Sequence, residues 1–113
     1  MANIKRVAVL GGGSFGTVLA NIAASNGYDV TLWVRDAEQA FRINSEGANS
    51  IYHPELKLSE NITASDDLKL VLSNSQYILV ATPSIIFEEV INRIEPFINS
   101  SVVVISCTKG IKP

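Results

Sequence analysis

The chain has 113 residues, of which 47% are hydrophobic and 18% charged, so one folded domain is expected and a disordered chain is excluded. Its formal charge of −2 gives no electrostatic reason to bind nucleic acid or an anionic membrane, and no apolar run approaches the ~20 residues that insert into a bilayer. A single cysteine favours a reducing, cytoplasmic setting, and we expect no metal site.

Short apolar runs alternate with segments of helical periodicity along the chain. Most of the runs are continuously apolar, which is typical of strands in a parallel sheet that is covered on both faces. In chain order, strands are expected at Val7–Leu10, Val30–Val34, Asn61–Ala64, Tyr77–Ala81 and Val102–Ile105.

Two helices are expected in the first half of the chain. The first ends at Gly27 and has an apolar face at helical spacing, formed by Phe15, Val18, Leu19, Ile22 and Ala23. The second begins at Asp36, with Gln39 as the third-position partner of a capping box, and runs to about Ser45. A polar loop, Glu46–Glu60, follows it.

Two further helices are expected in the second half. A short one, capped by Ser65 or Asp66, runs through Leu72. The last is capped by Ser84, ends at Pro96 and turns inward the apolar side chains of Ile86, Val90, Ile91 and Ile94. Four aromatic side chains are interpreted as core residues, namely Trp33, Phe41, Phe87 and Phe97.

Three glycines in the turn after the first strand form the pattern G-x-G-x-x-G: Gly11, Gly13 and Gly16. In dinucleotide sites the first glycine permits the tight turn, the second lets a pyrophosphate approach the backbone, and the third lets the helix pack closely on the sheet. Backbone N–H groups of Ser14 and Phe15 would then face the phosphates. The alternative is a glycine-rich turn that binds nothing; a P-loop is excluded because its lysine is missing.

This pattern and the alternation of elements together predict an α/β fold. Its expected form is a three-layer, Rossmann-like doubly wound parallel sheet with strand order 3-2-1-4-5. The end of the second strand then bears on cofactor choice, because the adenosine ribose lies there. Arg35 occupies the place of a 2′-phosphate, which its guanidinium can bind with two hydrogen bonds, so NADPH is favoured over NADH. Asp36 can accept from a ribose hydroxyl, and the alternatives are a solvated Arg35 and an Asp36 that only caps a helix.

Residues that leave the fourth and fifth strands are expected at the same edge of the sheet. Lys109 follows the fifth strand, which is expected to be buried, and can bind a substrate phosphate or carboxylate or polarise a carbonyl. A special role for Lys109 and the absence of one are equally compatible with the spacing. His53 is interpreted as a surface residue and Cys107 as a packing residue.

Five segments, in the right order, resemble bacterial NAD(P)-dependent glycerol-3-phosphate dehydrogenases. Their family patterns are G-x-G-S-[WF]-G-T-A-L-A, L-W-x-R-[DN], N-x-x-Y-L-P, A-[VT]-P-S and [ST]-K-G-[IL]-[ED]. The matching residues here are 11–20, Thr31–Asp36, Asn49 with Tyr52–Pro54, Ala81–Ser84 and Ser106–Ile111. The chain departs from the patterns at His53, where leucine is usual, and at Lys112, where an acidic residue is usual.

The resemblance implies an oxidoreductase that interconverts dihydroxyacetone phosphate and sn-glycerol 3-phosphate with NADP or NAD and feeds glycerophospholipid synthesis. It implies that Ser14, Phe15, Arg35 and Tyr52 contact the dinucleotide and that Lys109 contacts both cofactor and substrate. The main proton donor of the family lies in a C-terminal helical domain. Residues 1–113 are therefore expected to be the NAD(P)-binding domain without that catalytic domain, inactive alone, and the full-length enzyme is expected to be a homodimer.

Two alternatives are kept. One is the N-terminal domain of another two-domain dehydrogenase, of the 6-phosphogluconate or ketopantoate reductase type. The other is a stand-alone, non-catalytic module that senses nucleotides.

Overall fold

Five parallel strands form one sheet in the order β3-β2-β1-β4-β5, as predicted. The computed structural model describes residues 5–11, 13–49, 55–73, 75–82, 87–98 and 102–106, without the side chain of Phe87. The strands are β1 (Arg6–Leu10), β2 (Asp29–Trp33), β3 (Ile62–Ser65), β4 (Tyr77–Val80) and β5 (Val103–Ser106).

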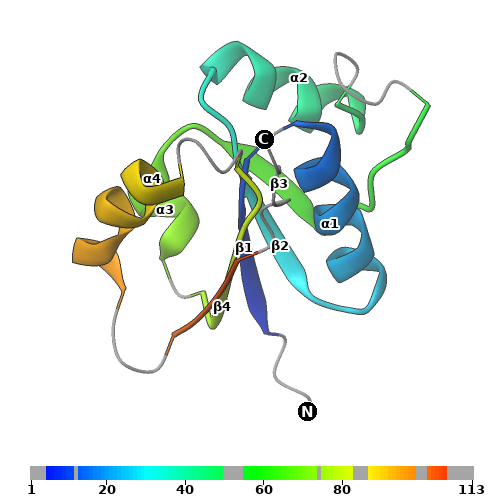
Figure 1. The fold of residues 1–113 in the computed structure, drawn as a ribbon. Helices are drawn as coiled ribbons and strands as arrows, with labels where there is room; N and C mark the ends of the chain where they lie inside the picture. Colours follow the sequence, from blue (N-terminus) through cyan, green and yellow to red (C-terminus); the bar gives the residue numbers. More distant parts are fainter. Residues whose placement is uncertain are drawn as a thin grey trace, which may run out of the picture.

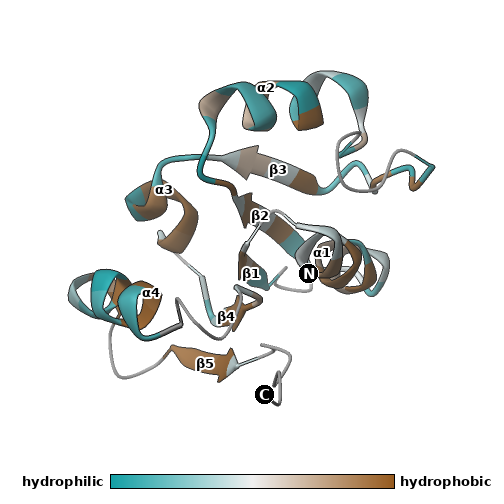
Figure 2. Cartoon of the chain, turned by 45° about the horizontal axis from the view of Figure 1, so that its top comes forward, coloured by the Kyte–Doolittle hydropathy of each residue, from teal (hydrophilic) through white to brown (hydrophobic). Residues whose placement is uncertain are grey.

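Helices cover both faces of the sheet and make the fold three-layered. They are α1 (Ser14–Ser25), α2 (Ala37–Glu46), α3 (Leu68–Leu72) and α4 (Phe87–Ile94), with a 3₁₀ turn, η2 (Glu95–Phe97), after α4. In Figure 1, α1 and α2 lie on one side of the sheet and α3 and α4 on the other. Each pair of helices closes its own apolar core against the sheet. Figure 2 shows the same division, with an apolar and a polar side on α4.

Alternate side chains of strand β1 enter the two cores on opposite faces of the sheet. Val7 and Val9 pack into the core under α1 and α2, whereas Ala8 and Leu10 pack into the core under α3 and α4. All four side chains are buried, because β1 lies between β2 and β4 and helices cover both faces of the sheet. Burial on both faces accounts for the continuous apolar run in the sequence.

The buried face of α1 differs from the expected one. Its buried residues are small and are Gly16, Thr17, Ala20 and Ala24. Phe15 and Ile22, expected on the inner face, are 38% and 54% exposed. Helical spacing identified an apolar stripe, but close packing of α1 on the sheet selects the stripe of small side chains beside it.

Two predicted core aromatics are on the surface. Phe41 is 71% exposed and Phe97 is 44% exposed, so both assignments were wrong, and the assignment of Phe87 lies outside the described side chains. Phe41 lies on the outer side of α2, whose inner side is Ala40 and Ile43. Trp33 is confirmed as a core residue at 3% exposure, and its Nε1 donates to the Asp66 carbonyl at 3.1 Å.

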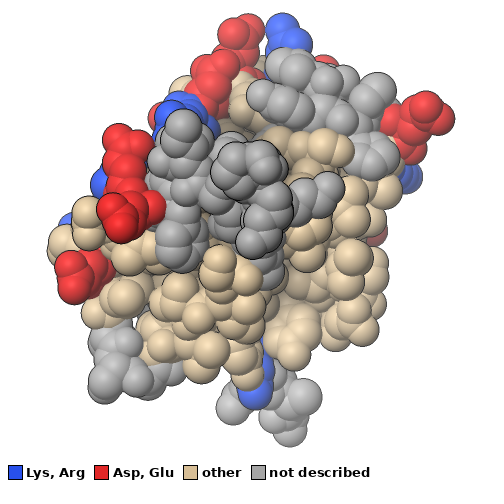
Figure 3. Space-filling model, in the orientation of Figure 1, with Lys and Arg blue, Asp and Glu red and all other residues tan. Residues whose placement is uncertain are grey.

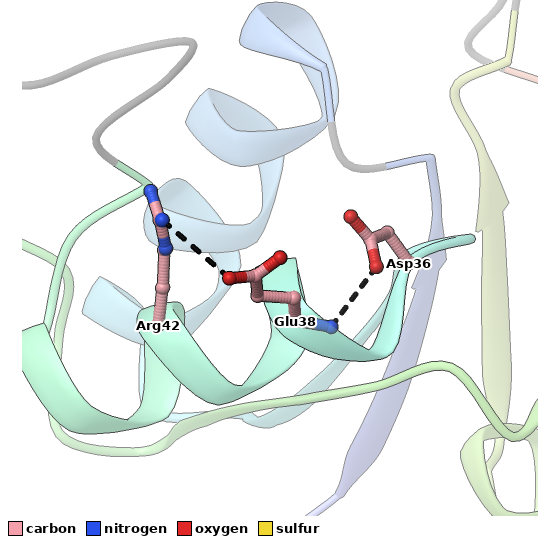
Figure 4. A network of polar contacts seen from close by, with 3 residues as sticks. All are labelled: Asp36, Glu38 and Arg42. Atoms are coloured by element: carbon pink, nitrogen blue, oxygen red, sulfur yellow. Dashed lines mark hydrogen bonds and ion pairs between the residues drawn. The ribbon is translucent and has the colours of Figure 1, made fainter.

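Helix ends agree only partly with the expected caps. Asp36 caps α2 by accepting from the Glu38 N–H at 3.0 Å, and Glu38 pairs with Arg42 one turn on at 3.6 Å (Figure 4). The cap of α3 is Asp67, one or two residues beyond the expected Ser65 or Asp66. Ser65, Asp66 and Asp67 are all residue types that can cap a helix. The helix begins at the buried Leu68, so the residue directly before it, Asp67, is the cap.

The end of α4 follows the sequence more closely. Val90 and Ile94 are buried as predicted, and the helix gives way to η2 at Glu95, with Pro96 in that turn. The predicted Ser84 cap and Ile86 lie outside the described residues.

Strand β5 is more exposed than its sequence predicted. Each of its four residues is exposed, including Val103 at 49% and Ile105 at 42%. It pairs with β4 at the edge of the sheet, and a continuous apolar run does not distinguish an edge strand from a central one. In Figure 3 the charged side chains lie mostly around the rim of the visible face. Within the described part of the chain, no helix has the length and apolar composition to cross a bilayer.

Candidate functional site

The turn between β1 and α1 lies where the strand order reverses. Gly11 adopts a φ of +123°, which favours glycine, and its N–H donates to the Trp33 carbonyl at the end of β2 at 3.1 Å. A Cβ on Gly11 would lie 3.0 Å from the carbonyl oxygen of Ala81, directly after β4. The turn is therefore held between the carboxyl ends of β2 and β4, the place where doubly wound sheets bind ligands.

The start of α1 is pressed onto this turn. A Cβ on Gly16 would lie 1.9 Å from the carbonyl oxygen of Gly11, a distance that no side chain can occupy. The contact and the positive φ agree with the structural roles predicted for Gly11 and Gly16, a tight turn and a close approach of helix to sheet.

Gly13 is different because it faces open space. It is the N-cap of α1 in an extended conformation, with φ −78°, and a Cβ there would meet no described atom within 4 Å. Gly13 has no side chain to cap the helix, and the first turn of α1 carries no acidic residue. The positive end of the helix dipole is therefore not offset within its first turn, and the surface beside Gly13 is suited to an anion.

A chain of hydrogen bonds reaches the carbonyl of Gly13, and its middle bond, between Asn49 and Thr17, is buried. The carbonyl of Gly13 accepts from the N–H of Thr17 at 3.0 Å and from its hydroxyl at 2.7 Å. The Asn49 Nδ2 donates to the Thr17 hydroxyl at 2.8 Å, and Gln39 in turn donates to the Asn49 Oδ1 at 3.2 Å. Thr17 and Asn49 are 0% and 1% exposed. Asn49 lies in a segment that resembles a family motif, and the sequence predicted no role for it. Gln39 donates to Asn49, whereas the sequence predicted a capping box between Gln39 and Asp36.

Thr82 supplies a buried polar atom at the same edge of the sheet. Its hydroxyl is buried without a hydrogen-bond partner among the described residues, and its backbone nitrogen lies 3.4 Å from the place of a Gly11 Cβ. Buried hydroxyls are normally satisfied, so a polar group missing from the described residues is expected here. Thr82 belongs to the Ala81–Ser84 segment that resembles the family pattern, but no role was predicted for its side chain.

Arg35 lies two residues beyond Trp33, whose carbonyl holds Gly11. Its side chain is 58% exposed, and its Nη2 lies 3.9 Å from the Oε1 of Glu89 on α4, which is 67% exposed. Exposed pairs of this kind contribute at most about 1 kcal/mol, so the guanidinium can change partners at little cost. Asp36 caps α2, as one of its two interpretations predicted. Its other predicted role, accepting a hydrogen bond from a ribose hydroxyl, stays a prediction.

The predicted site residues divide into two groups. The structure brings together Gly11, Gly13, Ser14, Phe15 and Gly16 in one turn, with Arg35 at the end of the neighbouring strand. Tyr52 and Lys109 lie outside the described residues, as do His53 and Cys107.

This arrangement fits an extended dianionic ligand with a nucleotide at one end. The space beside Gly13 is open among the described residues, because a Cβ there would meet none of their atoms within 4 Å, and the helix end favours negative charge. Arg35 stands at the end of β2, where the adenosine ribose of a dinucleotide lies in such sheets. The residues present therefore fit NAD or NADP.

Comparison with known proteins agrees with this fit. Residues 6–113 match the family model described as the N-terminus of NAD-dependent glycerol-3-phosphate dehydrogenase. The chain belongs to this family. It is 47% identical over 104 residues to a glycerol-3-phosphate dehydrogenase [NAD(P)+] of Alcanivorax borkumensis, covering 92% of this chain and 30% of that protein.

Two solved structures of glycerol-3-phosphate dehydrogenases are similar to the fold. The enzyme from Coxiella burnetii is 36% identical, with a TM-score of 0.88 over 96% of this chain and 33% of that one. The enzyme from Saccharomyces cerevisiae is 27% identical, with a TM-score of 0.88 over 97% of this chain and 35% of that one. This chain thus spans about a third of its relatives. Family membership decides against the 6-phosphogluconate and ketopantoate reductase alternatives.

Proposed function

We propose that this chain is the cofactor-binding domain of an enzyme that interconverts dihydroxyacetone phosphate and sn-glycerol 3-phosphate with NADP or NAD, and so supplies glycerophospholipid synthesis. One observation carries the proposal: at the switch point of the sheet, the N-terminus of α1 begins at a glycine whose missing Cβ leaves space for a pyrophosphate. Membership of the dehydrogenase family supports the reaction and its substrate.

The bound nicotinamide would supply the hydride, and the residues of this chain would bind and orient it. Gly11 and Gly16 hold the turn against the sheet, and the N–H groups of Ser14 and Phe15 bind the phosphates. Arg35 pairs with a 2′-phosphate, and Tyr52 contacts the dinucleotide. Lys109, three residues after β5 in the sequence, contacts cofactor and substrate. The proton donor for the reduced carbonyl is expected outside residues 1–113, so these residues alone are expected to be inactive.

The reaction is tested in a chimera. The part of the Alcanivorax borkumensis protein that matches this chain is replaced by residues 1–113, which share 47% identity with it over 104 residues. We expect the chimera to oxidise NADPH in the presence of dihydroxyacetone phosphate, measured by absorbance. A chimera that binds NADPH and leaves dihydroxyacetone phosphate unreduced would contradict the proposed substrate.

The same chimera tests Lys109 through Lys109→Met, which keeps the length of the side chain and removes its charge. Negative charge develops on the carbonyl oxygen during hydride transfer, and a cation near it favours the transition state. We expect kcat to fall on the order of 10²-fold, as for loss of one oxyanion donor. A rise in KM with kcat unchanged would make Lys109 a ground-state binding residue only.

Arg35→Ala tests the preference for NADPH. Hydrogen bonds to charged groups contribute about 1.5–3 kcal/mol, so we expect NADPH binding by this chain to weaken ~10-fold or more and NADH binding to change little. Glu89→Gln is the matched variant, because it removes the present partner of Arg35 and should strengthen NADPH binding slightly. Isothermal titration calorimetry with both cofactors decides the matter. Equal losses for both cofactors would show that Arg35 does not discriminate between them.

The setting of the full-length protein follows from the same proposal. The single cysteine supports a cytoplasmic location, and a homodimer is proposed for the full-length enzyme. Size-exclusion chromatography with light scattering checks whether the full-length enzyme is a homodimer.

A stand-alone nucleotide sensor would bind cofactor equally well, and the chimera distinguishes it from the proposed enzyme domain because a sensor would not support reduction of dihydroxyacetone phosphate.

A further inference from the structure

Two fully buried polar side chains lie directly behind the glycine turn. Thr17 and Asn49 come from α1 and from the segment after α2, and both are buried more completely than Ser75 or Thr82, the other buried polar residues of the described chain. Burying a polar group is unfavourable unless it is hydrogen-bonded, and both are bonded: the Thr17 hydroxyl donates to the Gly13 carbonyl, and Asn49 donates to the Thr17 hydroxyl.

The donors and acceptors in the Asn49–Thr17–Gly13 chain follow from the number of protons that each group carries. The Thr17 hydroxyl has one proton, and the Nδ2 of Asn49 donates to the hydroxyl oxygen at 2.8 Å. The hydroxyl proton is therefore directed to the Gly13 carbonyl, 2.7 Å away. Gln39 donates to the Oδ1 of Asn49 at 3.2 Å and so orients the amide with its nitrogen toward Thr17.

Fixing this carbonyl also fixes an N–H group on the outside of the turn. The Gly13 carbonyl and the Ser14 N–H belong to one planar trans peptide and point in opposite directions. The carbonyl points into α1 toward Thr17, so the Ser14 N–H points the opposite way, out of the N-terminal end of the helix. Gly13 makes such a restraint necessary because glycine rotates about its backbone more freely than other residues.

We propose that Asn49 and Thr17 are positioning residues for phosphate binding: together they hold the Gly13–Ser14 peptide in the orientation that presents the Ser14 N–H to the pyrophosphate of the cofactor. This inference rests on the proposed function. It assigns Asn49 a role through Thr17 and the peptide, without contact with the cofactor. The role is common to NADH and NADPH, because both carry the pyrophosphate.

Thr17→Val tests the proposal, since valine has the shape of threonine without the hydroxyl. Dissociation constants of this chain for NADH and NADPH are measured by calorimetry, and the melting temperature is measured in parallel. We expect both cofactors to bind about tenfold more weakly, as for one poorly aligned charge-assisted hydrogen bond, with their ratio unchanged. Thr17→Ser, which keeps the hydroxyl, should bind within about twofold of the wild type.

Ser75→Ala is the matched control. Ser75 is also buried, and its hydroxyl donates to the carbonyl four residues before it, Val71, at 3.1 Å, as that of Thr17 does to Gly13. Losing this bond should lower the melting temperature without changing either dissociation constant. Asn49→Ala should weaken both cofactors, and adding Thr17→Val to it should weaken them little further, because both residues act on one carbonyl.

The outcomes separate this inference from the proposed function. If the wild type binds NADH, Gly13→Val does not, and Thr17→Val binds NADH normally while melting earlier, Thr17 is only structural and the inference is wrong. If the double variant Asn49→Ala/Thr17→Val loses as much binding free energy as the two single variants added together, Asn49 does not act through Thr17, and that part of the inference is wrong. If the wild type binds neither cofactor, the proposed function itself fails.

Discussion

Gly13→Val is expected to abolish measurable cofactor binding while leaving the fold intact. The backbone of Gly13 has φ −78°, which valine adopts readily, and a Cβ there meets no described atom within 4 Å. The valine methyl groups would instead occupy the space proposed for the pyrophosphate. Losing two hydrogen bonds to a charged ligand, each about 1.5–3 kcal/mol, weakens binding by roughly 3–6 kcal/mol, a hundredfold or more.

Calorimetric titration with NADH and NADPH measures this effect, and circular dichroism checks the fold. Gly13→Ala, which adds the Cβ alone, should lie between the wild type and Gly13→Val. Ser25→Val is the matched control, because it places the same side chain at the exposed C-terminal end of α1, far from the glycine turn between β1 and α1. Binding by Gly13→Val at the wild-type affinity would remove the observation on which the proposed function rests.

The sheet and its order could be predicted because the signals are local. Most of the strands are largely apolar runs, and the glycine pattern after β1 marks the crossover from which the order of a doubly wound sheet follows. The cap at Asp36 and the inward side chains Val90 and Ile94 were also predictable, since both depend on neighbours along one helix.

Features that depend on distant contacts were not predictable. The inner face of α1 is decided by how closely Gly16 approaches Gly11, and no periodicity reports that distance. The exposure of β5 depends on whether another element lies over it, which an apolar run does not show. Asn49 is buried through bonds to residues 10 and 32 positions away, and its sequence neighbours give no sign of them.

Gly16→Ala is expected to destabilise the protein, although helix propensity alone would predict that it stabilises it. In an exposed helix, replacing glycine by alanine stabilises the protein by up to about 1 kcal/mol. At Gly16 the new Cβ would lie 1.9 Å from the carbonyl oxygen of Gly11; that oxygen belongs to the backbone, and the Cβ is fixed rigidly to the backbone of α1. Neither can move aside without shifting α1 or the end of β1. We expect Gly16→Ala to lower the free energy of unfolding by about 3 kcal/mol or more, at the upper end of overpacking effects.

Urea denaturation followed by circular dichroism measures the loss. Ser25→Ala is the matched control, because it makes an alanine on the exposed last turn of the same helix and should be neutral or slightly stabilising. The folded fraction of Gly16→Ala should also bind NADH more weakly, since a displaced α1 carries the Ser14 N–H away from the phosphate position. An unfolding free energy equal to or above the wild-type value would show that the turn can open, and the close approach of α1 to β1 would then not be what requires glycine at this position.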